Sequence, residues 1–536
     1  MKPLSIRDII GPVMVGPSSS HTAGALRIAS MVRNLLQAEP AKATFTLFGS
    51  FAHTYRGHGT DRALVAGLLG LHTDDLRIRE SFDLATERGL EFEFVPDTIT
   101  KTPHPNTVEV AVTDVLGNQV LARGISIGGG AAELSRIDGV DVRITGEFSS
   151  MIVRQKDLPG TLAHIASTLG QAGINIGTST LHRTRVGGDA FTVMDVDDPV
   201  PSEVIDKILE FPAVRSVRFI PADGLNRKIG EDSDEFDPEE ALAAFRRLDF
   251  PSARKLLDFC ERKNMSLSAA AELRERALLA TKGTSDSAIE GYLSRVIEVM
   301  RASASAPVQQ PAPSMGGLIG GEAAKLAALE AAGTGIGGTL VANATRNAVA
   351  VLETNAAMGL IVAAPTAGSA GVIPSVLLSL QTEHGFSDEQ LICALENAAI
   401  VGSIIARNAT VAGAEGGCQA EIGSAAAMAA SAACELLGGT PRMCLTAAGF
   451  ALANMLGLVC DPIGGLVEAP CQKRNAAGAV NALSAAQLAL AGIEGKIPFD
   501  EVVDAMYKVG RSLPYELRET ALGGMAACPS CANYCH

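Results

Sequence analysis

The sequence predicts a multidomain protein with an α/β N-terminal domain, a ferredoxin-like (βαββαβ) domain and an all-α C-terminal domain. Up to about residue 148, short alternating polar and apolar runs are mixed with helical patterns. Residues 149–222 carry strand and helix patterns in the order β-α-β-β-α-β, which is the ferredoxin-like arrangement. From residue 253 onward nearly every segment has a helical pattern, interrupted by glycine-rich turns.

Length and composition limit the class of protein. The chain has 536 residues, enough for about three domains. Hydrophobic residues make up 47% but aromatic residues only 4%, so small side chains must fill the core, as in closely packed helices. The net charge of −15 and the absence of Lys/Arg runs argue against a nucleic-acid surface and favour a small-molecule partner.

The sequence favours the cytoplasm and no membrane. The first residues lack the apolar stretch of a signal peptide, and ten cysteines suit a reducing compartment. Residues 354–382 and 443–460 carry no charge, but the first contains prolines and glycines and the second is barely long enough to span a bilayer. We therefore expect buried helices of a large domain.

In the N-terminal domain, alternation predicts strands at 43–49, 108–112 and 140–144, and helices are expected at 23–36 and 62–71.

In the second domain the expected strands and helices are 151–155, 161–172, a strand starting at 174, 190–196, 202–211 and 214–220. The acidic segment 223–252 is expected to be a linker. The run of Ala, Ser, Pro and Gln at 302–314 is expected to be a loop between a helical hairpin and the main helical body.

Three cysteines carry the strongest chemical signal. Cys418, Cys460 and Cys471 are separated by 42 and 11 residues and lie beside Gly, Pro or Asp. Three thiolates without a fourth would leave one iron of a [4Fe-4S] cluster open to substrate. The alternative is three unrelated buried thiols, since free cysteine is among the most buried residue types.

Two N-terminal motifs offer polar groups. Gly16 to Gly24 places Ser18, Ser20, His21 and Thr22 before a helix, where N–H groups and the helix dipole suit a carboxylate; an ordinary N-cap is the alternative. His58 lies between two glycines and is followed by an acid, as in an accessible histidine or a plain surface turn.

Two further motifs are rich in proline. Prolines on both sides would hold His104 in a rigid extended segment before Asn106, although an ordinary loop has the same pattern. Residues 364–374 combine Thr366, Ser369 and Gly371 between prolines, which favours a tight bend at a ligand site.

Taken together, these motifs resemble those of the iron–sulfur L-serine dehydratases, also called L-serine deaminases. The resemblance covers essentially the whole chain. In the family's β domain it rests on 16–24, 57–61 and 104–106. In its α domain it rests on 320–322, 355–359, 364–374, 415–419, 460–465 and 470–475.

The resemblance implies α,β-elimination of water from L-serine, giving pyruvate and ammonia, as in amino-acid degradation and gluconeogenesis. It implies a [4Fe-4S] cluster on Cys418, Cys460 and Cys471. The base is expected to be His58, with His21 second. The expected substrate-binding residues are Ser18, Ser20, Thr22, His104, Asn106, Thr366, Ser369 and Gly371.

Residues 149–222 resemble an ACT domain through the turn Asp157-Leu158-Pro159-Gly160 and through Asn175. ACT domains commonly bind amino acids, so serine is expected as an allosteric effector there. The resemblance divides the chain into a β domain (1–148), the ACT domain (149–222), the linker (223–252) and an α domain (253–536). A homo-oligomer, dimer or tetramer, is expected.

The C-terminal segment departs from the family pattern. Relatives without an ACT domain can end in a cysteine that caps the open iron, but here Cys535, Cys528 and Cys531 all compete for that position as fourth ligand. A separate metal site made by these three and His536, or a frayed terminus, is also compatible with the sequence.

Two other functions remain open at this stage. A pyridoxal-phosphate lyase performs the same chemistry, although no lysine in a phosphate-binding glycine loop supports it. A non-enzymatic amino-acid sensor, built on the ACT domain with the cysteines as a redox switch, is the second.

Overall fold

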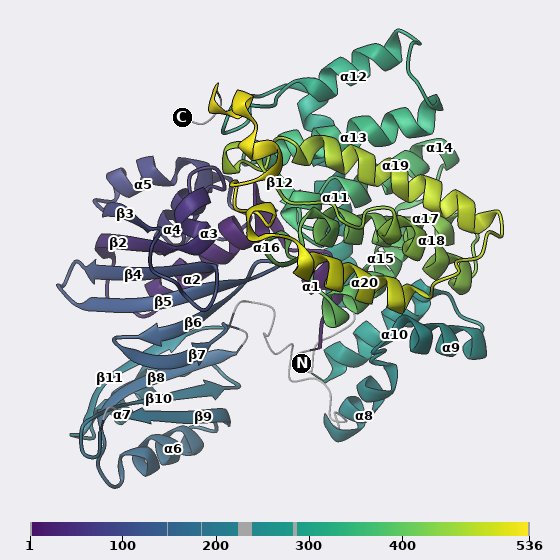
Figure 1. The fold of residues 1–536 in the computed structure, drawn as a ribbon. Helices are drawn as coiled ribbons and strands as arrows, with labels where there is room; N and C mark the ends of the chain where they lie inside the picture. The colour runs from purple at the N-terminus through teal and green to yellow at the C-terminus, as the bar shows by residue number, and fades with distance from the viewer. Residues whose placement is uncertain (1–2, 147, 184, 223–237, 282–286, 534–536) are drawn as a thin grey trace.

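The computed structural model describes residues 3–533 apart from 147, 184, 223–237 and 282–286, and it contains three bodies (Figure 1). An α/β sheet domain and a smaller sheet domain lie on one side, and a large helical body lies on the other. The predicted fold class is confirmed.

The N-terminal domain contains a six-stranded sheet in the order β3-β2-β4-β5-β6-β7. β2 and β3 are parallel, and the other neighbours are antiparallel. Alternate β2 residues Ala43, Phe45 and Leu47 are buried, as the sequence pattern predicted. The strands are β2 (Pro40–Phe48), β3 (Glu91–Asp97), β4 (Asn106–Asp114), β5 (Gln119–Gly128), β6 (Ala131–Ile137) and β7 (Val140–Ile144).

Helices cover this sheet and carry the N-terminal motifs. α2 (Gly24–Arg33) packs on β5 and β6 and against α4 (Thr60–Leu68). The remaining helices are η1 (Ser19–Ala23), α3 (Gly49–Thr54), η2 (Leu76–Glu80) and α5 (Ser81–Glu87).

The second domain has the predicted βαββαβ order and an antiparallel sheet ordered β11-β8-β10-β9. One side of the sheet packs under the two helices, through Met151, Val153 and Met194. On the other side, Phe191 and Val193 join the core of the N-terminal domain. The elements are β8 (Ser149–Lys156), α6 (Thr161–Gln171), β9 (Ile176–Arg183), β10 (Asp189–Val196), α7 (Ser202–Leu209) and β11 (Val214–Ile220).

The helical body is built around α17 (Ser424–Leu436), which packs against α14, α15, α18 and α19. Residues 424–434 are all buried, and alanine is the commonest among them, so neighbouring helices approach closely. The surrounding helices are α9 (Ala253–Lys263), α10 (Leu267–Ala280), α11 (Ser287–Gln309), α12 (Glu322–Ala331), α13 (Gly338–Ala356), α14 (Val372–His384), α15 (Asp388–Asn408), α16 (Gly413–Gly416), α18 (Pro441–Ala453), α19 (Cys471–Leu490) and α20 (Phe499–Ser512).

The start of the chain belongs physically to this helical body. α1 (Ile6–Ile9) packs on α15, and Ile6 and Ile9 enter the helical core. β1 (Val13–Val15) pairs antiparallel with β12 (Leu360–Val362). This pairing joins the N-terminal domain to the helical body directly beside the motif that begins at Gly16.

Two segments differ from the sequence-based expectation. The loop expected at 302–314 is wrong over its first part, because α11 continues to Gln309 with Pro307 inside it. Proline cannot donate to the Ser303 carbonyl one turn earlier, but the Thr354 hydroxyl donates to that oxygen at 2.8 Å and replaces the missing bond.

In the expected linker, residues 223–237 lie outside the described residues, whereas Pro238–Leu248 forms α8. Phe245 of α8 packs on Ala277 and Leu278 of α10.

The charge-free stretches form no single long helix: residues 354–382 include the end of α13, β12, a bend and most of α14. Within the described residues, one helix is long and apolar enough to span a membrane, and it is α15. Some 67% of its apolar 18-residue window is buried inside the protein, as in the core helix of a globular domain.

Candidate active site

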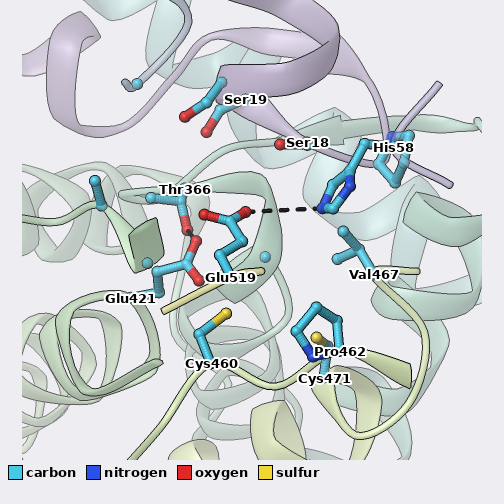
Figure 2. Close-up of a pocket in the computed structure, with 16 residues that line it drawn as sticks. Ser18, Ser19, His58, Thr366, Glu421, Cys460, Pro462, Val467, Cys471 and Glu519 are labelled. Carbon is cyan, nitrogen blue, oxygen red and sulfur yellow. Dashed lines mark hydrogen bonds and ion pairs between the residues drawn. The ribbon is translucent and has the colours of Figure 1, made fainter. Parts of the chain in front are cut away.

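A pocket lies between the N-terminal domain and the helical body (Figure 2). Distant parts of the chain supply its lining: Pro17, Ser18, Ser19, Ser20, His58 and Gly129 from the N-terminal domain, and Thr366, Gly368, Ala412, Gly413, Glu421, Cys460, Pro462, Val467, Cys471 and Glu519 from the C-terminal part of the chain. Residues that the sequence analysis took from separate motifs are therefore neighbours in space.

The three predicted cysteines converge beside this pocket, and all three are buried. Cys460 and Cys471 line it, and the Sγ atoms of Cys418 and Cys460 and a carboxylate oxygen of Glu421 all lie within 4.8 Å of one another. Cys471 is the first residue of α19, where the positive end of the helix dipole favours a thiolate.

The loops that carry these cysteines are fixed by specific contacts. Gly417, with φ of 74°, precedes Cys418, and a side chain on it would meet the Leu458 carbonyl at 2.9 Å. The Arg474 guanidinium lies 3.6 Å from Cys418 Sγ and forms an ion pair with Asp461 at 2.7 Å.

This donor set fits an iron–sulfur cluster. Cysteine thiolates are the ligands of such clusters. Two of the thiols line the pocket, and the third, Cys418, lies beside Cys460 and next to the Arg474 cation. Cys418, Cys460 and Cys471 would hold the group.

Tail cysteines, by contrast, do not reach the pocket within the described residues. Cys531 Sγ donates to the Met525 carbonyl at 2.9 Å, and Cys528 Sγ faces the Gly524 carbonyl. Cys535 and His536 lie outside the described residues, so the structure gives no placement for Cys535 as a fourth ligand or for the alternative tail metal site.

His21 and His58 form a buried stack with ring centroids 4.4 Å apart. His58 Nδ1 lies 3.4 Å from the Thr54 carbonyl, which can only accept, so Nδ1 carries the proton and Nε2 is left as an acceptor. His21 Nε2 lies 2.9 Å from the Ser50 hydroxyl. His58 lines the pocket, and His21 lies behind it.

Burial keeps both imidazoles neutral. It lowers the pKa of His58 to about 4, while the Thr54 carbonyl opposes this shift. Burial, and then the charges of His58 and His104, hold the pKa of His21 well below its usual value. Each ring can therefore accept a proton at neutral pH.

The hydroxyl run begins a short π-helix, η1, and two of its groups are used in the fold. Ser18 caps η1 by accepting the His21 N–H at 3.1 Å. The Thr22 hydroxyl donates to the His58 carbonyl at 2.7 Å, which ties the two N-terminal motifs together. Ser18 and Ser20 line the pocket, together with Ser19, which the sequence analysis did not select.

The bend at 364–374 contributes one of its three predicted residues to the lining. Thr366 lines the pocket, but Ser369 and Gly371 do not. The Ser369 hydroxyl lies 3.1 Å from that of Thr366, and the Gly371 N–H donates to Asn475 at 3.0 Å. These two residues hold the bend from behind.

His104 and Asn106 also lie outside the lining. His104 Nδ1 accepts the Asn106 N–H at 3.1 Å. The Pro105 carbonyl between them accepts the N–H of Ser50, whose hydroxyl contacts His21. This segment therefore supports the histidine pair from one layer behind.

Two acidic residues in the pocket escaped the sequence analysis. Glu421 accepts a hydrogen bond from the Thr366 hydroxyl at 2.7 Å, and a side chain on Gly413 would lie 2.7 Å from its other oxygen. Glu519 lies between His58 and Cys460 (Figure 2). Burial raises the pKa of both carboxyls. The only sequence signal for Glu421 is its proximity to Cys418, and the only one for Glu519 is that it is an acid within a glycine-rich tail.

Residues predicted for the ACT effector lie at the surface of the second domain. Asp157 forms an ion pair with Arg183 at 2.9 Å and accepts the Gly187 N–H. Leu158, Pro159 and Gly160 are exposed, and Gly160, with φ of 88°, begins α6. Asn175 donates to Asp197 at 2.7 Å.

Family models match all three bodies. The model described as serine dehydratase alpha chain matches residues 247–526, which is more than half of the chain. The chain belongs to the serine dehydratase family. The serine dehydratase beta chain model matches residues 5–134, and the ACT domain model matches residues 149–213.

Curated members of this family align with one half of the chain or with all of it. The probable L-serine dehydratase alpha chain of Bacillus subtilis is 45% identical, over 52% of this chain and 92% of that protein. The probable beta chain of the same organism is 40% identical, over 41% of this chain and 99% of that protein. The L-serine dehydratase of Streptomyces coelicolor is 29% identical over 98% of both chains.

Proposed function

We propose that this protein is an L-serine dehydratase that removes water from L-serine and releases pyruvate and ammonia. The convergence of three buried cysteines and a neutral histidine on one pocket is the observation that carries the proposal. Relatives with that name align over nearly the whole chain, from Streptomyces coelicolor and from Helicobacter pylori.

We assign a [4Fe-4S] cluster to Cys418, Cys460 and Cys471. When bound, such a cluster supplies a Lewis-acidic iron that draws charge from the substrate hydroxyl, which is otherwise a poor leaving group. Three protein ligands leave one iron free for that role.

The chain's own residues perform the remaining steps. His58 Nε2 accepts the α-proton, because its Nδ1 is committed to the Thr54 carbonyl. The C–H electron pair becomes the Cα–Cβ double bond, and the hydroxyl leaves with the Cβ–O pair and gains a proton to become water. The resulting aminoacrylate tautomerises to an imine, which water hydrolyses.

Substrate binding falls to both sides of the pocket. Ser18 and Ser20 from the N-terminal domain and Thr366 from the helical body line it, and we assign them to the substrate carboxylate and amine. Thr22, His104, Asn106, Ser369 and Gly371 act one layer behind, where they hold the lining segments in place.

The pocket is less suited to the alternative cofactor. A pyridoxal-phosphate lyase needs a lysine that can form a Schiff base, and no lysine lines the pocket among the residues that the structure describes. The sensor alternative predicts no turnover, and the assay below separates it from an enzyme.

We further propose that the ACT domain is regulatory and binds an amino acid, most simply serine, near the Asp157–Gly160 turn and Asn175. The turn is exposed, and its N–H groups precede α6. The homo-oligomer and the cytoplasmic location expected from the sequence remain predictions.

The test is anaerobic purification and reconstitution with ferrous iron and sulfide, followed by measurement of pyruvate released from L-serine. Cys460→Ser should abolish turnover and lose most bound iron, because a buried ligand is removed. Cys393→Ala is the matched control, since Cys393 is an exposed cysteine of α15 and should keep both. Normal iron and normal turnover in Cys460→Ser would refute the ligand assignment.

A further inference from the structure

Glu519 faces the histidine pair, and the proposed reaction gives it no role. Its Oε1 atom lies 3.7 Å from His58 Nε2 and 3.9 Å from His21 Nδ1. We propose that Glu519 is a positioning residue for the base: it directs His58 Nε2 into the pocket and stabilises the imidazolium that forms when this nitrogen takes the α-proton. This inference rests on the proposed function.

The surroundings of His58 leave this task to Glu519. Thr54 fixes one ring nitrogen, His21 covers one face of the ring, and Nε2 points towards the Glu519 carboxylate (Figure 2). A separation of 3.7 Å is longer than a hydrogen bond and can shorten when Nε2 becomes a donor. Burial raises the pKa of Glu519 to about 8, and the positive charge that His58 gains with the α-proton favours the ionised carboxylate, which in turn stabilises the imidazolium.

Besides the histidines, the Glu519 carboxylate has a hydrogen bond from the backbone N–H of Ala414. Among the described residues, His21 and His58 are the only basic side chains within ion-pair distance of its carboxylate. The second pocket acid, Glu421, accepts the Thr366 hydroxyl and has no histidine within that distance. The two acids therefore differ in what they can do: only Glu519 can act through the base.

The segment 513–520, here called the strap, delivers Glu519 to this position. Cys460 N–H donates to the Leu517 carbonyl, and Glu519 N–H donates to the Cys460 carbonyl, both at 2.9 Å. Glu519 has φ of 60°, a left-handed conformation that is uncommon for a residue other than glycine. Such conformations persist where the surroundings impose them, often at functional sites.

Glu519 is thus held through its main chain and faces the histidines with its side chain. Its main chain is paired with a proposed cluster ligand, and its side chain faces the proposed base. The position of Cys460 in the helical body in this way fixes the carboxylate that faces His58 of the N-terminal domain.

The kinetic test compares wild type, Glu519→Gln and Glu519→Asp with Glu516→Gln, which alters an exposed acid of the same strap. In reconstituted enzyme, Glu519→Gln should lower kcat by about 10- to 100-fold, as expected for a weakened general base, and leave iron content and KM within about threefold. The deuterium isotope effect with α-deuterated serine should rise, because proton abstraction becomes slower. Glu519→Asp should lie between wild type and Glu519→Gln.

A second measurement does not depend on turnover. In iron-free protein labelled with ¹⁵N only at histidine, the His58 signals are assigned from a His58→Gln sample. They should show the proton on Nδ1, and the Nε2 signal should move in Glu519→Gln but not in Glu516→Gln.

Three results would overturn the inference. A raised KM with unchanged kcat would assign Glu519 to the substrate ammonium instead. Loss of iron in proportion to activity would make it structural. Unchanged His58 signals would show that the two side chains do not interact. A wild-type enzyme that releases no pyruvate would refute the proposed function, and the NMR comparison would still report on the Glu519–His58 pair.

Discussion

His58 and His21 are stacked and each has one ring nitrogen near Glu519, but their hydrogen-bond partners differ. Two nitrogens of His21 contact serine hydroxyls, at 2.9 Å for Ser50 and 3.4 Å for Ser18. Among the residues that the structure describes, none forms a hydrogen bond with His58 Nε2, which lies 3.7 Å from Glu519 in the pocket. This difference ranks the two candidate bases by geometry.

We expect His58→Gln to lower kcat by roughly 100-fold or more at normal iron content, since general bases contribute about 10²–10⁴. His21→Gln should cost less, because His21 acts through its stacking on His58. The measurement is pyruvate release with iron and sulfide determined on the same samples. A larger loss in His21→Gln would reverse the assignment.

At the residue scale the sequence analysis selected the cysteines and His58, which lie at or beside the pocket, but neither of its acids. Cys460, Cys471 and His58 were marked by glycine and proline neighbours, which keep side chains accessible at turns. Glu421 and Glu519 carry no such mark, and Glu519 reaches the pocket only through the strap's pairing with Cys460. A contact between residues so far apart in sequence has no local signature.

At the element scale, two π-helices open onto the pocket. η1 follows Ser18, and η5 (Gln419–Gly423) follows Cys418. π-helical turns are rare and often occur at functional sites. The sequence pattern predicted a helix after the first of these motifs, but local composition does not distinguish this wider turn from an α-helical one.

The ACT domain was predicted element by element because short runs rich in β-branched and apolar residues indicate its strands and its turns contain glycine. α11 was predicted less well, because Pro307 was interpreted as the sign of a loop. The compensating bond from Thr354 comes from another helix and is invisible in local sequence.

Gly160 allows a test of the ACT domain as a regulatory element. Its φ of 88° strains any other residue, so Gly160→Leu should distort the turn before α6. We expect wild-type enzyme to show a sigmoidal dependence on serine, or a slow activation, that Gly160→Leu removes while maximal turnover stays within about threefold. Steady-state and progress-curve kinetics measure both.

Gly170→Leu is the matched control, because Gly170 lies on exposed α6 surface and a side chain there meets nothing within 4 Å. Hyperbolic kinetics in wild type, together with no binding of serine to the iron-free protein beyond the active site, would leave the domain a structural spacer.

At the scale of the whole molecule, the pocket exists only when the domains are joined. Its lining comes from residues 17–20, His58, Thr366, Cys460 and Glu519, among others. The β1–β12 pairing lies next to Gly16, and a side chain on Gly16 would clash with Asn355 of α13. These contacts therefore fix the position of the N-terminal domain relative to the helical body at the site. The sequence motifs indicated which segments carry polar side chains, whereas the relative position of the two domains depends on close packing between distant segments.

The last element to meet this site is the tail. The Met525 N–H donates to Asp461 at 2.7 Å, and Asp461 is paired with Arg474 beside Cys418. Cys528 and Cys531 are held by contacts within the tail, which leaves Cys535 as the tail thiol to test. A thiol on the same chain as the pocket would compete with substrate at high effective concentration.

Removing residues 534–536 deletes Cys535 and keeps the Met525–Asp461 contact. If the tail caps the open iron in the resting enzyme, the truncation should shorten any lag and lower the apparent KM by about threefold or more, at unchanged iron content. Cys528→Ser is the control and should behave as wild type. Progress curves with anaerobic enzyme decide between the outcomes. Unchanged kinetics would rule out capping by Cys535. Loss of iron from the truncated enzyme would make Cys535 a permanent ligand, because the cluster stays bound when only a displaceable cap is deleted.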